Sequence, residues 1–246
     1  MTLKHRLRTW LWTFGYDVVR FRPDVHPLAR RRELLQTGRF DTVLDVGANA
    51  GQYARQLRKD LGYAGRIVSF EPLSTAYAEL SGHARRDPAW TTVHCALGAV
   101  DGTAQIQVAG NSYSSSLLDM LPAHLDAAPQ SARVDTETVT VRRLDAIIDD
   151  LCPARDRLFL KIDVQGFEPQ VLDGAASTLP RVQALQVEMS LVPLYAGEPT
   201  FAQMHDRLQD LGFALHSLEP GFAHPRTGQL LQVDGVYVRP GVVAAG

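Results

Sequence analysis

Hydrophobic and polar positions along the chain follow two alternating periods. Short continuous apolar runs, typical of strands buried on both faces of a parallel sheet, are separated by segments whose apolar residues recur every three or four positions, as in helices. The runs expected to form parallel strands are residues 42–46, 66–70, 91–94, 157–164 and 182–189. This order of strands and helices predicts an α/β fold with a mostly parallel sheet.

Helices are expected between these strands. The segments with helical spacing are residues 52–61, 73–81 and 200–211, and a further helix is expected after Gly166. The start of the third segment is clearly marked, because Thr200 and Gln203 form a capping box. Gly62 and Gly212 follow the ends of two of these helices, a position where glycine commonly terminates a helix.

Two other segments depart from the parallel order. Residues 213–218 and 232–239 are expected to pair antiparallel as a C-terminal hairpin, since a loop with Gly and Pro joins them. Between residues 103 and 143, segments of alternating polarity flank a Ser-rich loop at 111–118, which predicts a β-insertion in the main domain. Insertions of this kind often determine specificity.

Residues 1–40 are expected to form an N-terminal extension to a main domain at 41–246. Apolar residues at helical spacing from Met1 to Phe21 are mixed with Lys and Arg, which predicts a basic amphipathic helix. Residues 1–32 have a net charge of +6, which leaves −8 for the rest of the chain. We expect the apolar face to pack on the main domain, to form a homodimer, to contact a membrane surface peripherally or to cover the substrate.

The composition is that of an ordinary globular protein. The 246 residues are 45% hydrophobic and 21% charged with a net charge of −2, which argues against a nucleic-acid partner. Cys95 and Cys152 have neither the number nor the spacing of a disulfide framework or a zinc site. No apolar run reaches the length of a membrane span or forms a signal peptide, so we expect a cytoplasmic protein.

A glycine-containing loop follows the first expected strand, with the sequence Asp45-Val46-Gly47-Ala48-Asn49-Ala50-Gly51. Its glycines permit a tight turn and leave backbone amides accessible to a ligand. Asn49 takes the place of the second glycine in the dinucleotide fingerprint G-x-G-x-x-G. The loop therefore argues against an NAD-dependent dehydrogenase, the nearest alternative enzyme on such a sheet.

Acidic residues at this loop and the next strand suit a different cofactor. Asp45 can attract a cationic amino-acid group, and the loop amides can bind a carboxylate. Glu71 ends the second expected strand, where its carboxylate can accept both hydroxyls of a ribose. This pair predicts S-adenosylmethionine as the cofactor.

Several sequence runs resemble the FkbM family of S-adenosylmethionine-dependent methyltransferases: VLDVGANAGQYA, IVSFEP, HCALGAVDG, SSSLL, LKIDVQGFEPQVLDGA and QVEMSLVPLYAGE. The resemblance spans about residues 40 to 240. It implies a Rossmann-like class I methyltransferase fold, with a seven-stranded sheet and an antiparallel C-terminal hairpin. It also implies O-methylation of hydroxyls, frequently on sugars or polyketides. The residues that it places on the cofactor are Asp45, Gly47, Asn49, Gly51, Glu71, Ala96 and Leu97.

Methyl transfer to a hydroxyl needs a group that takes its proton, and two strand-end acids, Asp163 and Glu188, are the catalytic candidates. Glu168, in the following helix, is a third. Alternatively, Asp163 only holds the cofactor or caps that helix, and Glu188 only forms an ion pair with Lys161 or an arginine. A divalent metal ion bridged by the two acids is another alternative, although no His-rich spacing accompanies them.

Gln165 stands where many family members have Glu, so a metal or base role that needs an acid there is weakened. This residue also favours an alternative function, that of a methyltransferase-like binding module without turnover. The other alternative function, that of a dehydrogenase, is opposed by the glycine spacing and the terminal antiparallel pair.

The acceptor is expected to be a small molecule or glycan with a free hydroxyl, such as a sugar of a glycolipid, a polysaccharide or a secondary metabolite. Polar and aromatic residues of the Ser-rich loop and of the segment after the fifth strand are expected to face it, because hydroxyls and amides bind polyols. These residues are Asn111, Ser115, Ser116 and Tyr195.

Overall fold

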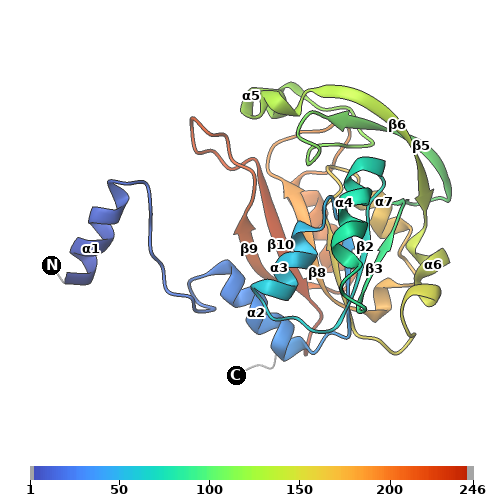
Figure 1. The fold of residues 1–246 in the computed structure, drawn as a ribbon, viewed down its shortest axis with the longest axis horizontal. Coiled ribbons are helices and arrows are strands. Elements are labelled where there is room, and N and C mark those ends of the chain that lie inside the picture. Colours follow the sequence, from blue (N-terminus) through green and yellow to red (C-terminus); the bar gives the residue numbers. More distant parts are fainter. Residues whose placement is uncertain (1–2, 243–246) are drawn as a thin grey trace.

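The structure is a computed structural model that describes residues 3–242. A seven-stranded sheet with the order β3-β2-β1-β7-β8-β10-β9 forms its centre (Figure 1). β10 runs antiparallel to β8 and to β9, and the other neighbouring strands are parallel. The predicted Rossmann-like methyltransferase fold with its antiparallel C-terminal hairpin is therefore confirmed. The strands of this sheet are β1 (Thr42–Val46), β2 (Arg66–Phe70), β3 (Trp90–Val93), β7 (Leu158–Ile162), β8 (Val182–Ser190), β9 (Ala214–Pro220) and β10 (Gln232–Val238).

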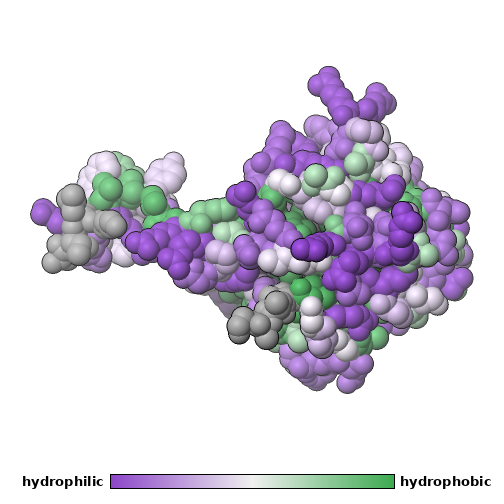
Figure 2. Space-filling view, turned by 90° about the horizontal axis from the view of Figure 1, so that it is seen from below, coloured by the Kyte–Doolittle hydropathy of each residue, from purple (hydrophilic) through white to green (hydrophobic). Residues whose placement is uncertain are grey.

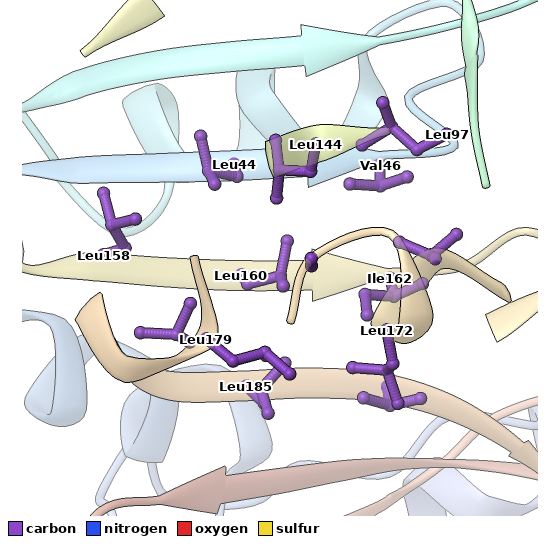
Figure 3. Packing of buried hydrophobic residues seen from close by; sticks show 14 of the residues in the cluster. Leu44, Val46, Leu97, Leu144, Leu158, Leu160, Ile162, Leu172, Leu179 and Leu185 are labelled. Carbon is purple, nitrogen blue, oxygen red and sulfur yellow. The ribbon is translucent and has the colours of Figure 1, made fainter. Parts of the chain in front are cut away.

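Helices cover both faces of the sheet because its strands are apolar on both sides. The helices are α1 (Leu3–Trp12), α2 (Pro27–Gly38), α3 (Gln52–Lys59), α4 (Ser74–Ala84), α5 (Pro122–Ala127), α6 (Leu144–Leu151), α7 (Glu168–Asp173) and α8 (Phe201–Asp210). One core lies between the sheet and α6, α7 and α8, and it includes Leu44, Leu160 and Leu185 (Figure 3). A second core lies against α2, α3 and α4 and includes Val43 and Phe159.

The insertion is a separate three-stranded sheet with the order β4-β6-β5. Its long strands, β5 (Gly102–Ala109) and β6 (Arg133–Arg142), are antiparallel, and β4 (Ala96–Leu97) adds to β6 in parallel. The sequence did not indicate β4, because two residues are too few to show a period. The Ser-rich loop folds back on β5, where Gln107 and Ser116 exchange two backbone hydrogen bonds of 2.8 and 3.2 Å.

The N-terminal helix is shorter than the predicted helix from Met1 to Phe21, whose first two residues lie outside the described part. It ends at Trp12, and Gly15 follows in the left-handed region at φ 77°. Residues 3–25, the N-terminal arm, project from the body (Figures 1 and 2). Within residues 3–242 no helix is both long and apolar enough to cross a membrane.

Candidate active site

A cavity of about 460 Å³ opens at the carboxyl ends of β1, β2 and β7. Open α/β sheets bind their ligands at this rim. Seven of the residues predicted from the sequence line it: Gly47, Asn49, Glu71, Ala96, Leu97, Ser115 and Asp163. The fold therefore brings together segments that are more than 100 residues apart in the chain.

Gly47 lets the loop after β1 pass close to the end of β7. Its φ is 75°, and a Cβ atom there would lie 1.8 Å from the carbonyl oxygen of Asp163. No side chain fits at that distance, so only glycine permits this close approach. Gly51, also with a positive φ, precedes α3 as its N-cap and contributes to the turn rather than to the cavity lining.

Glu71 is fixed by two backbone amides. Its Oε2 accepts the N–H of Asn49 at 2.8 Å, and its Oε1 accepts the N–H of Leu73 at 2.9 Å. Burial raises the pKa of Glu71 to about 7, although both hydrogen bonds oppose the rise. Each carboxylate oxygen retains a second lone pair, so the side chain can still accept two hydroxyl groups from a ligand in the cavity.

Asp45 lies beneath the cavity and not on its surface. The side chain is completely buried, and burial raises its pKa. Ser69 Oγ donates to Asp45 Oδ2 at 3.2 Å, and Lys161 Nζ lies 3.4 Å from Asp45 Oδ1. The direct contact with a cofactor that the loop sequence predicts is therefore not part of this arrangement, because Lys161 stands between Asp45 and the cavity.

Lys161 links the glycine loop to the strand-end acid. Its ammonium donates to the carbonyl of Gly47 at 3.1 Å and lies 3.3 Å from Asp163 Oδ2. Burial lowers the pKa of Lys161, but the carboxylates of Asp163 and Asp45 raise it by more, so the side chain remains charged. The sequence signal was a single lysine inside an apolar strand, where an unpaired charge would be too costly.

Gln165 holds the two candidate catalytic acids together. Its Nε2 donates to Asp163 Oδ1 at 2.8 Å and to Glu188 Oε2 at 2.6 Å. Its Oε1 accepts the hydroxyl of Tyr195 at 2.7 Å, which fixes the orientation of the amide. A glutamate at this position could not donate two such bonds. The departure from the family pattern thus adds a donor between two carboxylates that would otherwise repel each other.

The two acids differ in their access to the cavity. The Asp163 side chain is 34% exposed and lines the cavity. Glu188 does not line it, and it also accepts from Gln232 Nε2 at 2.9 Å. Burial and the neighbouring Asp163 raise the pKa of Glu188 well above its usual range. Glu168 is buried, and its Oε1 accepts the N–H of Val164 at 3.0 Å, so it stabilises the turn before α7.

The insertion covers one side of the cavity. Ser112 Oγ accepts from Asn49 Nδ2 at 3.3 Å, and the hydroxyl of Tyr113 accepts from Gln52 Nε2 at 3.0 Å. Both residues line the cavity together with Ser115. The Ser-rich loop was expected at the site, but Ser112 and Tyr113 were not, since nothing in the sequence distinguishes them from neighbouring polar residues.

The other three predicted acceptor residues form a network behind the cavity. Asn111 Nδ2 donates to Ser131 Oγ at 2.9 Å, and Ser116 Oγ donates to the carbonyl of Gln165 at 2.6 Å. Tyr195 is 1% exposed. The structure thus places Asn111, Ser116 and Tyr195 as supports of the loop and of Gln165, not at the cavity surface.

No group of three or more His, Cys, Asp or Glu residues within 3–242 is arranged to hold a metal ion. Between Asp163 and Glu188, the position expected for a bridging ion under the metal alternative, the amide nitrogen of Gln165 contacts both carboxylates.

Comparison with solved structures returns matches of low sequence identity. A methyltransferase FkbM from Methylobacillus flagellatus KT is 17% identical with a TM-score of 0.49, over 80% of this chain and 43% of that one. The chain therefore spans less than half the length of that protein. Fibrillarin from Aeropyrum pernix, solved with natively bound S-adenosyl-L-methionine, is 12% identical with a TM-score of 0.46, over 80% and 66% of the two chains.

Comparison with curated proteins returns no match. Comparison with protein families matches residues 45–215 to the methyltransferase FkbM domain. This range covers more than half of the chain, from the aspartate of the glycine loop into β9, and includes the cavity rim described above. The chain belongs to the FkbM family of methyltransferases.

Proposed function

We propose that the protein transfers the methyl group of S-adenosylmethionine to a hydroxyl group, and that the acceptor is a sugar of a glycolipid, a polysaccharide or a secondary metabolite. The observation that carries the proposal is the position of Glu71. Its carboxylate is held by Asn49 and Leu73 at the rim of the cavity and retains lone pairs for a diol.

The residues at the rim fit this cofactor. Glu71 would accept the ribose hydroxyls, and the apolar Ala96 and Leu97 would contact the adenine. The close approach at Gly47 leaves room for a ligand beside bare backbone. When bound, the cofactor supplies a methyl group on a sulfonium, which is an excellent leaving group, so the protein's main task is positioning.

Asp163 is the proposed general base. When a hydroxyl oxygen bonds to the methyl carbon and the sulfur–carbon bond breaks, the hydroxyl proton must pass to an acceptor, and Asp163 is the candidate acid that lines the cavity. General-base catalysis typically contributes about 10²- to 10⁴-fold. Glu188 acts in this proposal through Gln165, whose amide it holds against Asp163.

Calorimetric titration of the purified protein with S-adenosylmethionine and with NAD tests the cofactor. We expect binding of the first and none of the second; the opposite result would favour a dehydrogenase. Incubation with S-adenosylmethionine and glycan or metabolite extracts, followed by mass spectrometry, tests the transfer. We expect a species that gains one methyl group with the wild type and not with Asp163→Asn. Cofactor binding without any methylated hydroxyl product would favour the binding module.

We also propose that the N-terminal arm contacts the surface of an anionic membrane. Large apolar side chains stand exposed on it beside arginines, and aromatic residues with basic neighbours suit the lipid interface. The exposed apolar residues are Leu7, Trp10, Trp12, Phe14, Tyr16, Val18, Val19, Phe21 and Val25. The exposed arginines are Arg6, Arg8, Arg20 and Arg22.

Co-sedimentation with vesicles tests this contact. We expect binding to phosphatidylglycerol vesicles that falls when Trp10 and Trp12 are changed to serine. A matched change of two exposed valines on the body, Val100 and Val134, should leave it unchanged. The membrane proposal fails if the vesicles bind neither the wild type nor the tryptophan variant. If the tryptophan change instead converts a dimer to a monomer in size-exclusion chromatography, the arm is a homodimer contact.

A further inference from the structure

The cavity extends well beyond the residues proposed for the cofactor. Glu71 follows β2, whereas Glu219 lies on β9, at the far edge of the sheet, and both line the same cavity. Five strand spacings separate these two strands, which at about 4.8 Å each amount to roughly 24 Å. This second part lies under α2 and α3, and it is lined by polar side chains from five elements: Arg31, Tyr53, Gln186, Glu219 and Asp234.

Three carboxylates occupy one cross-strand row here. Asp234 on β10 is paired in register with Glu188 on β8 and with Glu219 on β9. Like charges placed directly opposite each other destabilise a sheet. Burial, with the added effect of Asp163, raises the pKa of Asp234 to about 6. The row therefore works against stability, which is typical of residues retained for function.

Arg31 closes this part of the cavity from α2. It is 6% exposed and forms an ion pair with Glu219 through Nη2, and its Nη1 donates to Gln56 Oε1 at 3.2 Å. Two buried polar atoms of the ion-paired residues, Arg31 Nε and Glu219 Oε1, have no hydrogen-bond partner within the described part of the chain. Unsatisfied buried groups are costly, so they call for an explanation.

We propose that this part of the cavity, the polyol subsite (Arg31, Tyr53, Gln186, Glu219 and Asp234), binds a neutral sugar ring of the acceptor. This inference rests on the proposed function. A hydroxyl both accepts and donates a hydrogen bond, so the hydroxyls of one ring suit a cavity surface on which the guanidinium of Arg31 alternates with the carboxylates of Glu219 and Asp234. Neighbouring hydroxyls of the same ring meet the carboxylate of Asp234, which accepts, and the amide of Gln186. The Oε1 of Gln186 accepts the hydroxyl of Tyr53 at 3.0 Å and keeps a second lone pair.

Charged ligands fit the polyol subsite less well. A carboxylate or the dianion of a phosphate monoester has no proton for Glu219 or Asp234, and these two carboxylates would repel it. An ammonium group has no lone pair for Arg31 and would face that guanidinium together with the nearby ammonium of Lys161. The interleaving of donors and acceptors therefore selects a neutral polyhydroxylated group.

The ion pair between Arg31 and Glu219 can be replaced by neutral side chains in a variant that is expected to fold. Removing one partner would leave a buried charge unpaired, whereas replacing both by neutral side chains of similar size is often tolerated. The test protein is therefore the double variant Arg31→Met/Glu219→Gln. The matched control is Arg207→Met/Asp173→Asn, which removes an ion pair of 2.7 Å between α8 and α7, away from the cavity.

Saturation-transfer NMR of the full chain with S-adenosylhomocysteine bound measures the ligand class. The probes are neutral methyl glycosides of common hexoses, deoxyhexoses and pentoses, with methyl glucuronide and methyl glucosaminide as the charged comparisons. We expect a neutral glycoside to bind most tightly, and its affinity to fall at least tenfold in the double variant but less than twofold in the control. The affinity for S-adenosylhomocysteine, measured by calorimetry, should change less than twofold in both.

Four results would overturn the polyol subsite. They are no binding of any neutral glycoside, tighter binding of a charged one, equal binding by the wild type and the double variant, and a tenfold loss of S-adenosylhomocysteine affinity in the double variant. The last would mean that the subsite holds the amino-acid end of the cofactor. Failure of the wild type to bind S-adenosylhomocysteine while a neutral glycoside still binds at Arg31 and Glu219 would instead contradict the proposed function alone.

Discussion

The backbone N–H of Asn49 donates to the carboxylate of Glu71 at 2.8 Å, which ties the loop after β1 to the end of β2. Asn49 adopts a positive φ of 46°, a conformation that asparagine tolerates better than most residues. The geometry of the rim is thus set by the protein itself before any ligand binds, which reduces the ordering that binding would require.

Glu71→Gln tests the role of this carboxylate. The amide has one acceptor oxygen in place of two, and its NH₂ group would face a backbone N–H. We expect the affinity for S-adenosylmethionine to fall by roughly 10- to 100-fold, since hydrogen bonds to a charged group contribute about 1.5–3 kcal/mol. Calorimetry measures the change. Glu79→Gln, an exposed residue on α4, is the control and should bind as the wild type does. Equal affinity in all three proteins would remove Glu71 from the cofactor site.

The raised pKa values of buried carboxyl groups determine how the free energy of unfolding depends on pH. Burial raises the pKa of Glu71 to about 7, above the 4.5 of an unfolded chain, and that of Glu168 also to about 7. Between these two pKa values the folded state binds more protons than the unfolded state does, so the free energy of unfolding falls as pH rises from about 4.5 to 7. Each proton of difference changes the free energy of unfolding by about 1.4 kcal/mol per pH unit.

Thermal unfolding of the ligand-free protein measures this dependence. We expect the melting temperature to decrease from pH 5 to pH 8, and Glu71→Gln to reduce the decrease because one titrating group is gone. A melting temperature that rises over this range, or one with the same slope in the variant, would show that the buried carboxyl groups do not govern stability there.

Gly47→Ala tests the close approach of the glycine loop to β7. A Cβ atom would overlap the carbonyl oxygen of Asp163, so the loop must move. We expect the variant to lose most of its cofactor affinity, and to be destabilised by more than the roughly 1–3 kcal/mol that backbone strain alone costs. Gly62→Ala is matched, because Gly62 also has a positive φ, at 67°, but no atom lies near its Cβ position. Similar effects of the two changes would argue against the contact.

Gln165→Glu tests the bridging amide. The change restores the residue that many family members have, but it places a third carboxylate between Asp163 and Glu188. The neighbouring carboxylates of Asp163 and Glu188 raise the pKa of the added carboxyl group. At lower pH it is therefore more often protonated and can donate one hydrogen bond, whereas at higher pH its charge is repelled. We therefore expect a loss of melting temperature that is larger at pH 8 than at pH 6. The exposed Gln130→Glu should show no such difference. A pH-independent effect would mean that the amide is not needed between the acids.

The sequence predicted the sheet and its strand-end residues well, because apolar runs and turn glycines are local signals. The positions of Glu71 and Asp163 follow directly from where β2 and β7 end. Asp45 was expected at the cavity because the sequence places it next to the glycine loop. Its side chain is instead completely buried beside the ammonium of Lys161, which lies 3.4 Å away, comes 116 residues later in the chain and itself lines the cavity.

The polyol subsite lay beyond prediction for a related reason. Arg31 and Glu219 are 188 residues apart, and each looks in the sequence like an ordinary charged surface residue. Only the packing of α2 against the antiparallel edge of the sheet buries both. Tyr195 is the opposite case. It was expected to face the acceptor, but in the fold its hydroxyl donates to Gln165 Oε1 and it does not reach the cavity.

A crystal structure of the protein grown with S-adenosylhomocysteine tests the central claim most directly. We predict that the two ribose hydroxyls lie within hydrogen-bond distance of Glu71 and that the adenine contacts Ala96 and Leu97. A nucleoside bound with its ribose away from Glu71, or a rim that stays empty while the ligand binds elsewhere, would contradict it.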